Sequence, residues 1–354
     1  MTDQSSRKFR LYSFVFTLVV IGYHARLPFL AEYDIVRSVY PYILRMYNYL
    51  CSIAMSYFFM TSGYMLYYGI TIENARQRFI RRIRSLLIPY FVWNLIYMGI
   101  YLVFRRDFFK DGVMAFVRGF TIDPFNGPFW YVLTIFALSA LVGPVLRLRQ
   151  ARIQILTTIC LLLVILSIAV QGFGLFNLLG FSEDELAIDW FVRFFRYLPA
   201  YMLGCWFGLE HSGYVDIKLK GRYRFGLVCL VIVITGMMLC FSEVPKIWQQ
   251  INLIFQPVLL WLIVNCGALR LKGDQAVRGS FMMYAMHTAI IMVVRYFLER
   301  TFSNDLDGLY VFLIWLLFPF AMMLLVYFVA YMLTLLMDKY HLSFLKLALT
   351  GDRR

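Results

Sequence analysis

Charged side chains are scarce in this 354-residue chain, and acidic ones are scarcer than basic ones. Charged residues make up 15% of the sequence, whereas soluble domains average about a quarter. Hydrophobic residues make up 62% of it. These values exclude an ordinary soluble domain and predict an integral membrane protein.

The sequence also lacks the patterns of a metal site, a disulfide scaffold or a transporter built from repeats. Its six cysteines include no CxxC pair and have no metal-type spacing. There is no convincing internal repeat of the kind that many secondary transporters contain. We therefore expect no bound metal, and we expect the cysteines to be packing residues: Cys51, Cys160, Cys205, Cys229, Cys240 and Cys266.

No cleaved signal peptide is expected at the amino terminus. The first apolar segment follows Arg7, Lys8 and Arg10, is too long for the core of a signal peptide, and lacks a small-residue cleavage site. We interpret this segment as the first membrane anchor.

Apolar runs of the length of a transmembrane helix are abundant. A bilayer core of about 30 Å needs roughly 20 helical residues. Such runs predict an all-α, polytopic membrane protein with about ten transmembrane helices in one domain over residues 1–354. The segments are residues 11–30, 48–70, 85–104, 128–146, 153–176, 190–209, 224–242, 247–268, 279–298 and 309–337.

Basic residues are distributed unevenly between these segments and predict the orientation of the chain. Residues 1–10, every second connection and the tail at 338–354 together hold most of the 34 Lys and Arg residues. Because cytoplasmic loops carry the basic excess, we expect a multi-pass protein of the inner (plasma) membrane with both termini in the cytoplasm. Contacts with anionic membrane lipids then explain the formal charge of +14, and no nucleic acid partner is expected.

One histidine lies deep in the first apolar segment. His24 is roughly 20 Å along a helix that starts at Leu11, which places it beyond the bilayer midplane. Ionisable groups at such depth usually face a bundle interior or a wet cavity and serve a function. The alternative is a neutral imidazole that is hydrogen-bonded between helices.

Four arginines inside the predicted spans lie near the outer ends of helices, where they could line one outward-facing cavity. Arg193 and Arg196 are three residues apart and share a helical face, and guanidiniums suit hydroxyl-rich, phosphate or carboxylate partners. The alternative is snorkelling of the guanidinium to the interface, which we favour for Arg26. The residues concerned are Arg26, Arg193, Arg196 and Arg295.

A basic cluster precedes the third apolar segment and contains Arg76, Arg78, Arg81, Arg82 and Arg84. Anchoring by the positive-inside bias explains such a cluster without a ligand, and basic clusters also bind lipid headgroups. Alternatively, several guanidiniums that converge at a helix end can bind the phosphates of a nucleotide or coenzyme.

The order of several motifs resembles the acyltransferase-3 superfamily, whose members are membrane enzymes that move acyl groups, commonly acetyl, onto extracytoplasmic glycans and related substrates. The resemblance runs through nearly the full length of the chain. The motifs are VVIGYH ending at His24, YFFMTSGYML with Ser62 and Gly63, RRIRSLLIPYFVWN with Arg81, Arg82, Arg84 and Pro89, GPFWYVLTIF with Trp130 and Tyr131, RYLPAYMLGCWFG, and GSFMMYAMH with Ser280, Phe281, Tyr284 and His287.

Some positions depart from the family pattern or leave a match open. The family usually has arginine eleven residues before the first-helix histidine, where this chain has Ser13, although Arg10 lies one turn earlier. It is open which of Arg81, Arg82 and Arg84 match the paired arginines of the family. The hydrolase-like extracytoplasmic domain of many members is expected to be absent, so we expect a stand-alone form.

The resemblance implies an acyl-CoA donor, commonly acetyl-CoA, bound from the cytoplasm with its phosphates near the basic cluster at Arg81, Arg82 and Arg84. Burial disfavours the imidazolium form, so a neutral His24 can take the proton of an attacking sugar hydroxyl as general base. His287 lies about 12 Å into its helix from the cytoplasmic side, which suits a role on the donor side, or else an interhelical hydrogen bond. No GxSxG elbow or serine triad is recognisable, so we prefer direct transfer.

The expected protein is therefore an O-acetyltransferase that moves an acetyl group from acetyl-CoA to a hydroxyl of a cell-surface or lipid-linked glycan. The resemblance alone makes Trp130 a substrate-binding candidate, and packing against the first helix is its alternative. Arg193 and Arg196 are substrate-binding candidates because of their guanidinium groups. There are two rival functions. One is a glycan or lipid-intermediate transporter, and the other is a module that binds a small ligand and signals. Loss of acyl-CoA that depends on His24 distinguishes the enzyme from both.

Overall fold

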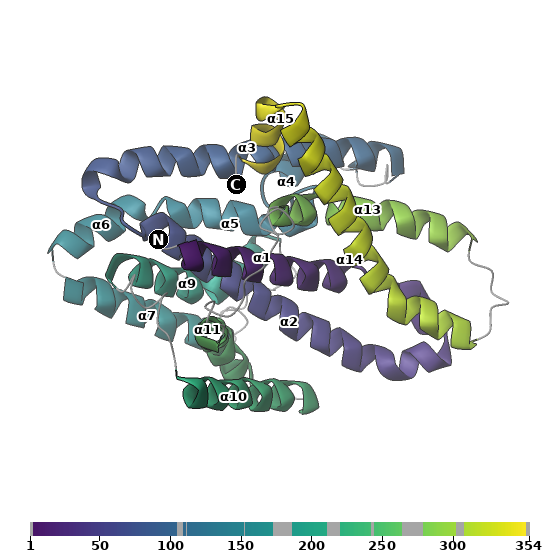
Figure 1. The fold of residues 1–354 in the computed structure, drawn as a ribbon, viewed down its shortest axis with the longest axis horizontal. Coiled ribbons are helices and arrows are strands. Elements are labelled where there is room, and N and C mark those ends of the chain that lie inside the picture. The colour runs from purple at the N-terminus through teal and green to yellow at the C-terminus, as the bar shows by residue number, and fades with distance from the viewer. Residues whose placement is uncertain are drawn as a thin grey trace. The chain divides into compact units, whose positions relative to one another are not determined.

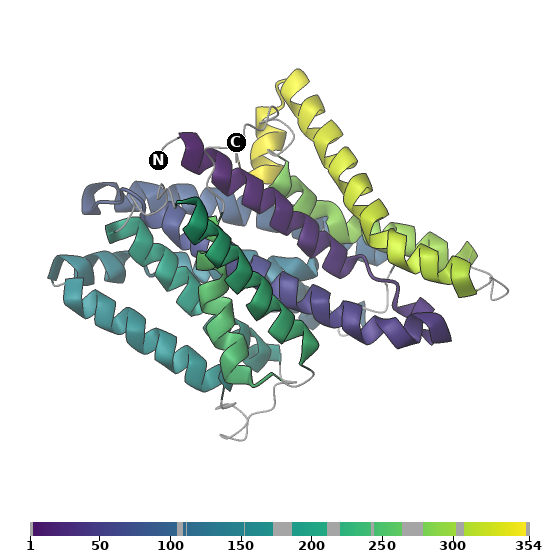
Figure 2. The same cartoon turned by 60° about the horizontal axis from the view of Figure 1, so that its bottom comes forward.

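The fold was analysed in a computed structural model, which describes residues 3–104, 109–110, 112–151, 153–172, 186–210, 220–241, 244–263, 279–301 and 308–351. Within these ranges every regular element is a helix (Figures 1 and 2), which confirms the all-α prediction. The helices are α1 (Asp3–His24), α2 (Asp34–Tyr67), α3 (Ile72–Phe104), α4 (Val113–Phe120), α5 (Trp130–Ser139), α6 (Val142–Ala151), α7 (Ile153–Gly172), α9 (Leu186–Glu210), α10 (Gly221–Cys240), α11 (Lys246–Ile263), α13 (Ser280–Thr301), α14 (Gly308–Lys339) and α15 (Ser343–Thr350), with 3-10 turns η1 (Pro28–Glu32) and η3 (Gly127–Phe129).

Several of these helices can cross a membrane. Each of the ten apolar segments overlaps a helix, but among the described residues five spans are both long and apolar enough to cross, so the number of ten is not confirmed. The protein is a polytopic membrane protein. The five spans are Ile72–Phe104, Gly127–Gln150, Gly221–Cys240, Ser280–Thr301 and Gly308–Lys339.

The chain divides into two compact units, which we describe separately. The first unit comprises Met1–Ser6 and Met55–Arg270, and the second comprises Arg7–Ala54 and Leu271–Arg354. One boundary falls inside α2, which continues from one unit into the other. The single domain over residues 1–354 stays a prediction.

In the first unit, α9 packs closely against α2 because glycines face the partner backbone. A Cβ atom at Gly204 would collide with the carbonyl oxygen of Met60, and one at Gly208 would lie 2.8 Å from the carbonyl oxygen of Tyr64. Gly63 on α2 in turn faces the backbone of α9. Small residues allow this close approach, which favours helix association in membranes. This packing gives the RYLPAYMLGCWFG segment a structural role.

A buried glutamine links three helices of the same unit. Gln250 on α11 donates from Nε2 to Ser167 Oγ of α7 (3.0 Å) and to the backbone carbonyl of Arg196 on α9 (2.8 Å). Ser167 Oγ donates to the carbonyl of Phe195 (2.6 Å). In apolar surroundings these bonds satisfy polar groups that would otherwise be costly to bury. They therefore fix the register of α7, α9 and α11.

In the second unit the first helix ends at His24, earlier than the apolar segment 11–30 suggested. Pro28 explains the early end, because proline disfavours the helical conformation of the residue before it. Leu27 accordingly has φ −111° and ψ 80°, and the chain continues as the 3-10 turn η1. His24 is thus the last residue of a helix rather than an interior one.

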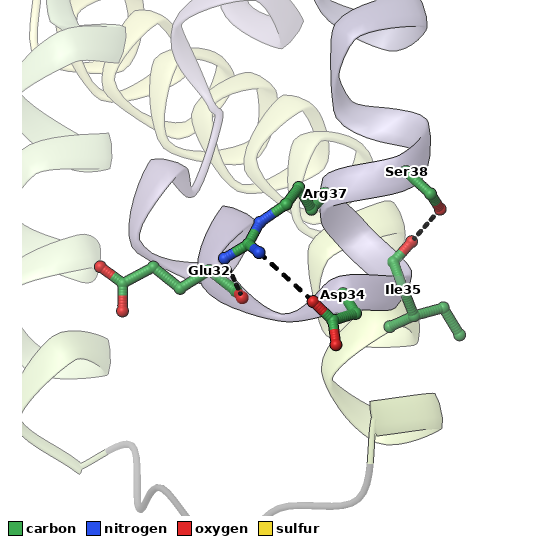
Figure 3. A network of polar contacts seen from close by, with 5 residues as sticks. All are labelled: Glu32, Asp34, Ile35, Arg37 and Ser38. Atoms are coloured by element: carbon green, nitrogen blue, oxygen red, sulfur yellow. Dashed lines mark hydrogen bonds and ion pairs between the residues drawn. The ribbon is translucent and has the colours of Figure 1, made fainter.

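The turn into α2 carries an exposed polar network (Figure 3). Arg37 donates to the carbonyl of Glu32 (2.9 Å) and pairs with Asp34 (3.4 Å). The side chains of Arg37 and Asp34 are 66% and 97% exposed, so the ion pair adds little stability. The network shapes the turn and is not a candidate site.

Contacts between α1 and α14 order the second unit. The rings of Phe14 and Tyr327 meet edge to face with centroids 5.7 Å apart. Gly22 packs against Met323 and Tyr47, and a Cβ atom at Gly22 would lie 2.5 Å from the Met323 methyl carbon. The last turns of α1 are therefore packed on α14 and α2.

The cysteine predictions have a mixed outcome. Cys205 is buried beside Gly63, as a packing residue would be, but Cys229 and Cys240 are exposed on α10. Cys266 lies outside the described residues.

Replacing Gly204 by alanine should destabilise the first unit. The added methyl group meets the α2 backbone, which cannot yield as a flexible side chain would, and overpacking of this kind costs about 1–3 kcal/mol. We expect a lower apparent melting temperature in detergent, measured by fluorescence-detected size-exclusion chromatography of heated samples.

Gly226→Ala on α10 is the matched control, because a Cβ atom there meets nothing within 4 Å. It should keep or raise the melting temperature, since alanine favours a helix over glycine by about 1 kcal/mol. Equal melting temperatures for the two variants would contradict the packing described for α9.

Candidate functional site

The two histidines singled out by sequence lie side by side in the second unit. His24 ends α1 and is half-buried, and His287 lies in α13 and is fully buried. Their ring centroids are 5.1 Å apart, with 51° between the ring planes. Two imidazoles at this separation can share or pass a proton, either directly or through one intervening group.

The hydrogen bond of His287 defines its tautomer. His287 Nδ1 lies 2.6 Å from the backbone carbonyl of Tyr284, and a carbonyl oxygen can only accept, so Nδ1 carries the hydrogen. In the neutral ring Nε2 then holds a free lone pair. Nε2 is buried and has no hydrogen-bond partner within the described part of the chain. His287 therefore presents an unused proton acceptor.

The proximity of the two rings was not predicted from the sequence. Counting residues along each helix placed His24 beyond the midplane and His287 on the donor side. That count assumes that each helix starts at the membrane surface, and it contains no information about how α1 and α13 are shifted along each other. The structure brings the residues together, because α1 ends at His24 and its ring packs against α13.

Aromatic and cationic groups surround the His24 end of α1. The Tyr23 ring meets the His24 ring edge to face at 4.9 Å, and the Arg26 guanidinium lies 4.4 Å from the centre of the Tyr23 ring. Such a cation–π contact is favourable when the groups are shielded from water. Snorkelling of Arg26 stays a prediction.

Arg295 contacts the backbone at the same place. Its Nη2 donates to the carbonyl oxygens of His24 (3.2 Å) and Arg26 (2.6 Å). Arg295, which the sequence made a candidate for lining a cavity, thus binds main-chain carbonyls at and just after the end of α1.

The basic cluster lies in the first unit, and its arginines differ in burial and in hydrogen-bond partners. Arg82 reaches from α3 to α2 and donates to Ser62 Oγ, whereas the side chains of Arg81 and Arg84 are exposed. Within the described residues Arg82 has no ion pair, and its Nε has no hydrogen-bond partner. A half-buried arginine whose Nε is still free to donate is suited to an anion. This bond also connects two residues of separate sequence motifs.

Arg78 of the same cluster has a structural role. Its guanidinium donates to the carbonyls of Tyr68 (2.6 Å) and Gly69 (3.0 Å), which follow the last residue of α2. The next helix is capped by reciprocal bonds between Thr71 and Asn74. Arg78 therefore caps the α2 end and closes the turn into α3.

Trp130 and Arg193 also lie together in the first unit. The Arg193 guanidinium is 5.4 Å from the centre of the Trp130 ring. Trp130 adjoins Tyr197 (5.8 Å) and Phe59 (6.1 Å), and the last two rings stack at 5.0 Å with 7° between them. Arg196 is half-buried, and its backbone carbonyl accepts the Gln250 bond. An aromatic wall with a guanidinium can bind a sugar ring and its hydroxyl or anionic groups.

Sequence analysis missed Asn94, which binds the backbone of the segment that leads into Trp130. Asn94 is fully buried in α3, donates to the carbonyl of Tyr90 (2.8 Å) and accepts from the backbone nitrogen of Asn126 (3.2 Å). Asn126 directly precedes η3, after which Trp130 begins α5. An amide in an otherwise apolar span was the available signal, because such groups are costly to bury without partners.

Clusters of three or more His, Cys, Asp or Glu side chains that could hold a metal ion do not occur in the described ranges. The absence of a metal stays a prediction. The polar groups that the structure does assemble are imidazoles in the second unit and guanidiniums with hydroxyl or aromatic neighbours in the first.

In a comparison with models of protein families, residues 14–336 match an acyltransferase domain. This range includes all the candidate residues described above. No functionally curated protein and no solved structure matches the chain.

Substituting Arg78 and Arg81 separately should distinguish structural from exposed arginines. Arg78→Gln removes the donors that cap α2, so we expect a lower apparent melting temperature, because the loss of a part-buried hydrogen bond costs about 0.5–1.5 kcal/mol. Arg81→Gln alters an exposed side chain and should leave the melting temperature unchanged. The reverse order would show that the cap is unimportant.

Proposed function

Because the chain belongs to the acyltransferase family whose model matches residues 14–336, we propose that this membrane acyltransferase is an O-acetyltransferase. The proposed donor is cytoplasmic acetyl-CoA, and the proposed acceptor is a hydroxyl of a cell-surface or lipid-linked glycan. Family membership supports the acyl transfer. The residues described above support the assignment of roles.

The observation that carries the proposal is the pairing of His24 with His287. Hydroxyl groups are weak nucleophiles. A base such as histidine that removes the hydroxyl proton during attack accelerates the reaction by roughly 10²–10⁴-fold. His24 lies at a helix end, and His287 beside it has a free Nε2 acceptor. We assign His24 as the general base and His287 as the imidazole that orients it and shares its proton.

Direct transfer accounts for every bond that changes. The acceptor oxygen attacks the thioester carbonyl carbon while His24 takes the hydroxyl proton. The tetrahedral intermediate collapses, the carbon–sulfur bond breaks, and the CoA thiolate leaves. The thiolate then takes the proton from the imidazolium, which returns the histidine pair to its neutral state. The products are the O-acetylated acceptor and CoA.

Arg82 is the best candidate for contact with the anionic part of the donor. It has a hydroxyl partner, Ser62, rather than a carboxylate, so a phosphate group would supply the charge that the described residues do not. Arg81 and Arg84 are exposed and would add contacts from the surface. The proposed donor site thus includes all three arginines, with Arg82 as its inner member.

The proposed acceptor site is the wall formed by Trp130 and Arg193, with Arg196 one turn further along α9. Trp130 would stack on a sugar ring, and the guanidiniums would bind its hydroxyl or acidic groups. The proposed orientation, with both termini in the cytoplasm of an inner-membrane protein, rests on the distribution of basic residues.

The first test is transfer of labelled acetyl from acetyl-CoA to the glycolipid fraction of the host by the full-length protein in vesicles. We expect label on glycan with the intact chain and a loss of at least about 100-fold with His24→Ala, since the general base is removed. His341→Ala is the matched control, because His341 follows α14, far along the chain from both candidate histidines, and should leave the rate unchanged.

Transfer that survives in His24→Ala would exclude the general-base role while leaving the enzyme intact. Absence of transfer and of thioester loss in the folded wild-type protein, with acceptor present, would favour another donor or the transporter.

Donor recognition is tested by Arg82→Gln with Arg81→Gln as control. Loss of a charge-assisted contact should raise the KM for acetyl-CoA about tenfold or more in Arg82→Gln, and by less in the exposed control. Equal, small effects would mean that the phosphates bind elsewhere.

A further inference from the structure

The side chain of Arg295 binds main-chain carbonyls at the end of α1. Two hydrogen bonds run from its Nη2 to the carbonyl oxygens of His24 (3.2 Å) and Arg26 (2.6 Å). The last carbonyls of a helix have no donor within the helix. Here the backbone nitrogen of Ala25 donates to the carbonyl of Ile21 (2.8 Å), but among the described residues no backbone donor reaches the carbonyl of His24. A side chain from another helix therefore holds this end.

The same helix, α13, also contacts the His24 side chain. His287 precedes Arg295 by about two turns of α13, and its ring lies 5.1 Å from that of His24. The helix α13 thus contacts His24 at two points, the imidazole through His287 and the carbonyl through Arg295. Movement of either point would change how the two imidazoles face each other.

We propose that Arg295 is a positioning residue that fixes the carboxyl end of α1 and thereby the orientation of the His24 imidazole for acyl transfer. The inference rests on the proposed function of His24. Both hydrogen bonds go to main-chain carbonyls, so Arg295 acts through His24 and does not need to contact substrate. It extends the functional unit on α13 from His287 to Arg295.

The guanidinium is suited to this task in a way that an ammonium group is not. A guanidinium presents donors in a rigid plane and can bind two carbonyls that are two residues apart. Lysine retains the charge but presents a compact group on a flexible stem. Arg295→Lys should therefore hold the end of α1 only in part, and Arg295→Gln should release it.

The matched control is Arg300→Gln on the same helix. Arg300 is exposed, and its guanidinium lies 3.7 Å from the centre of the neighbouring Tyr296 ring. The control removes an arginine of α13 without altering the end of α1.

The experiment measures steady-state acetyl transfer and hydrogen–deuterium exchange of the full-length protein in nanodiscs. We expect Arg295→Gln to lower kcat about 10- to 100-fold with the KM for acetyl-CoA unchanged, because misplacement of a catalytic group affects turnover more than binding. Exchange at residues 22–27 should rise. Arg295→Lys should fall between wild type and Arg295→Gln in both measurements, and Arg300→Gln should match wild type.

A normal kcat in Arg295→Gln, a defect confined to KM, or unchanged exchange at residues 22–27 would overturn the proposal. If Arg295→Gln does not fold, Arg295→Lys is held to the same two criteria. If the wild-type protein shows no transfer, the proposed function fails, and exchange alone decides whether Arg295 fixes the end of α1.

Discussion

The end of α1 depends on satisfying backbone carbonyls in apolar surroundings. A polar group buried without a partner costs roughly 2–7 kcal/mol, depending on the reference state. Pro28 prevents the helix from continuing, so carbonyls that α1 would have paired must find donors elsewhere. Arg295 supplies donors to the carbonyls of His24 and Arg26, and α13, with His287, lies at the residue where α1 ends. The position of the histidine pair is thus a consequence of how a helix terminus is capped.

In the first unit, buried backbone and side-chain polar groups also need hydrogen-bond partners. Glycines let α9 approach the α2 backbone, and Gln250 satisfies polar groups across three helices. Arg78 binds carbonyls at the end of α2 as Arg295 does at the end of α1. Arg82 differs, because its partner is a hydroxyl and it keeps a donor to spare. This difference explains why one residue of the basic cluster is the preferred anion contact.

The sequence was sufficient for the fold class and for the family. Apolar runs of about 20 residues have few alternatives to membrane helices. The family that was predicted from the order of motifs, from VVIGYH to GSFMMYAMH, was confirmed by the family match. Residue patterns also identified both histidines, but not that they are adjacent, since depth along a helix does not fix how two helices are aligned. The early end of α1 was missed although Pro28 was visible, because apolarity continues to Leu30. Asn94 was missed because a single amide in an apolar run gives no indication of its partner.

The central claim is that His24 and His287 act as one unit, and a double-mutant cycle on acetyl transfer tests it most directly. The rates of His24→Ala, His287→Ala and the double variant would be compared with wild type at equal amounts of folded protein. If the imidazoles act together, the double variant should be about as slow as the slower single variant, because the second substitution removes a function that is already lost. A double variant whose loss equals the product of the two single losses would show that the histidines act independently and would contradict the account.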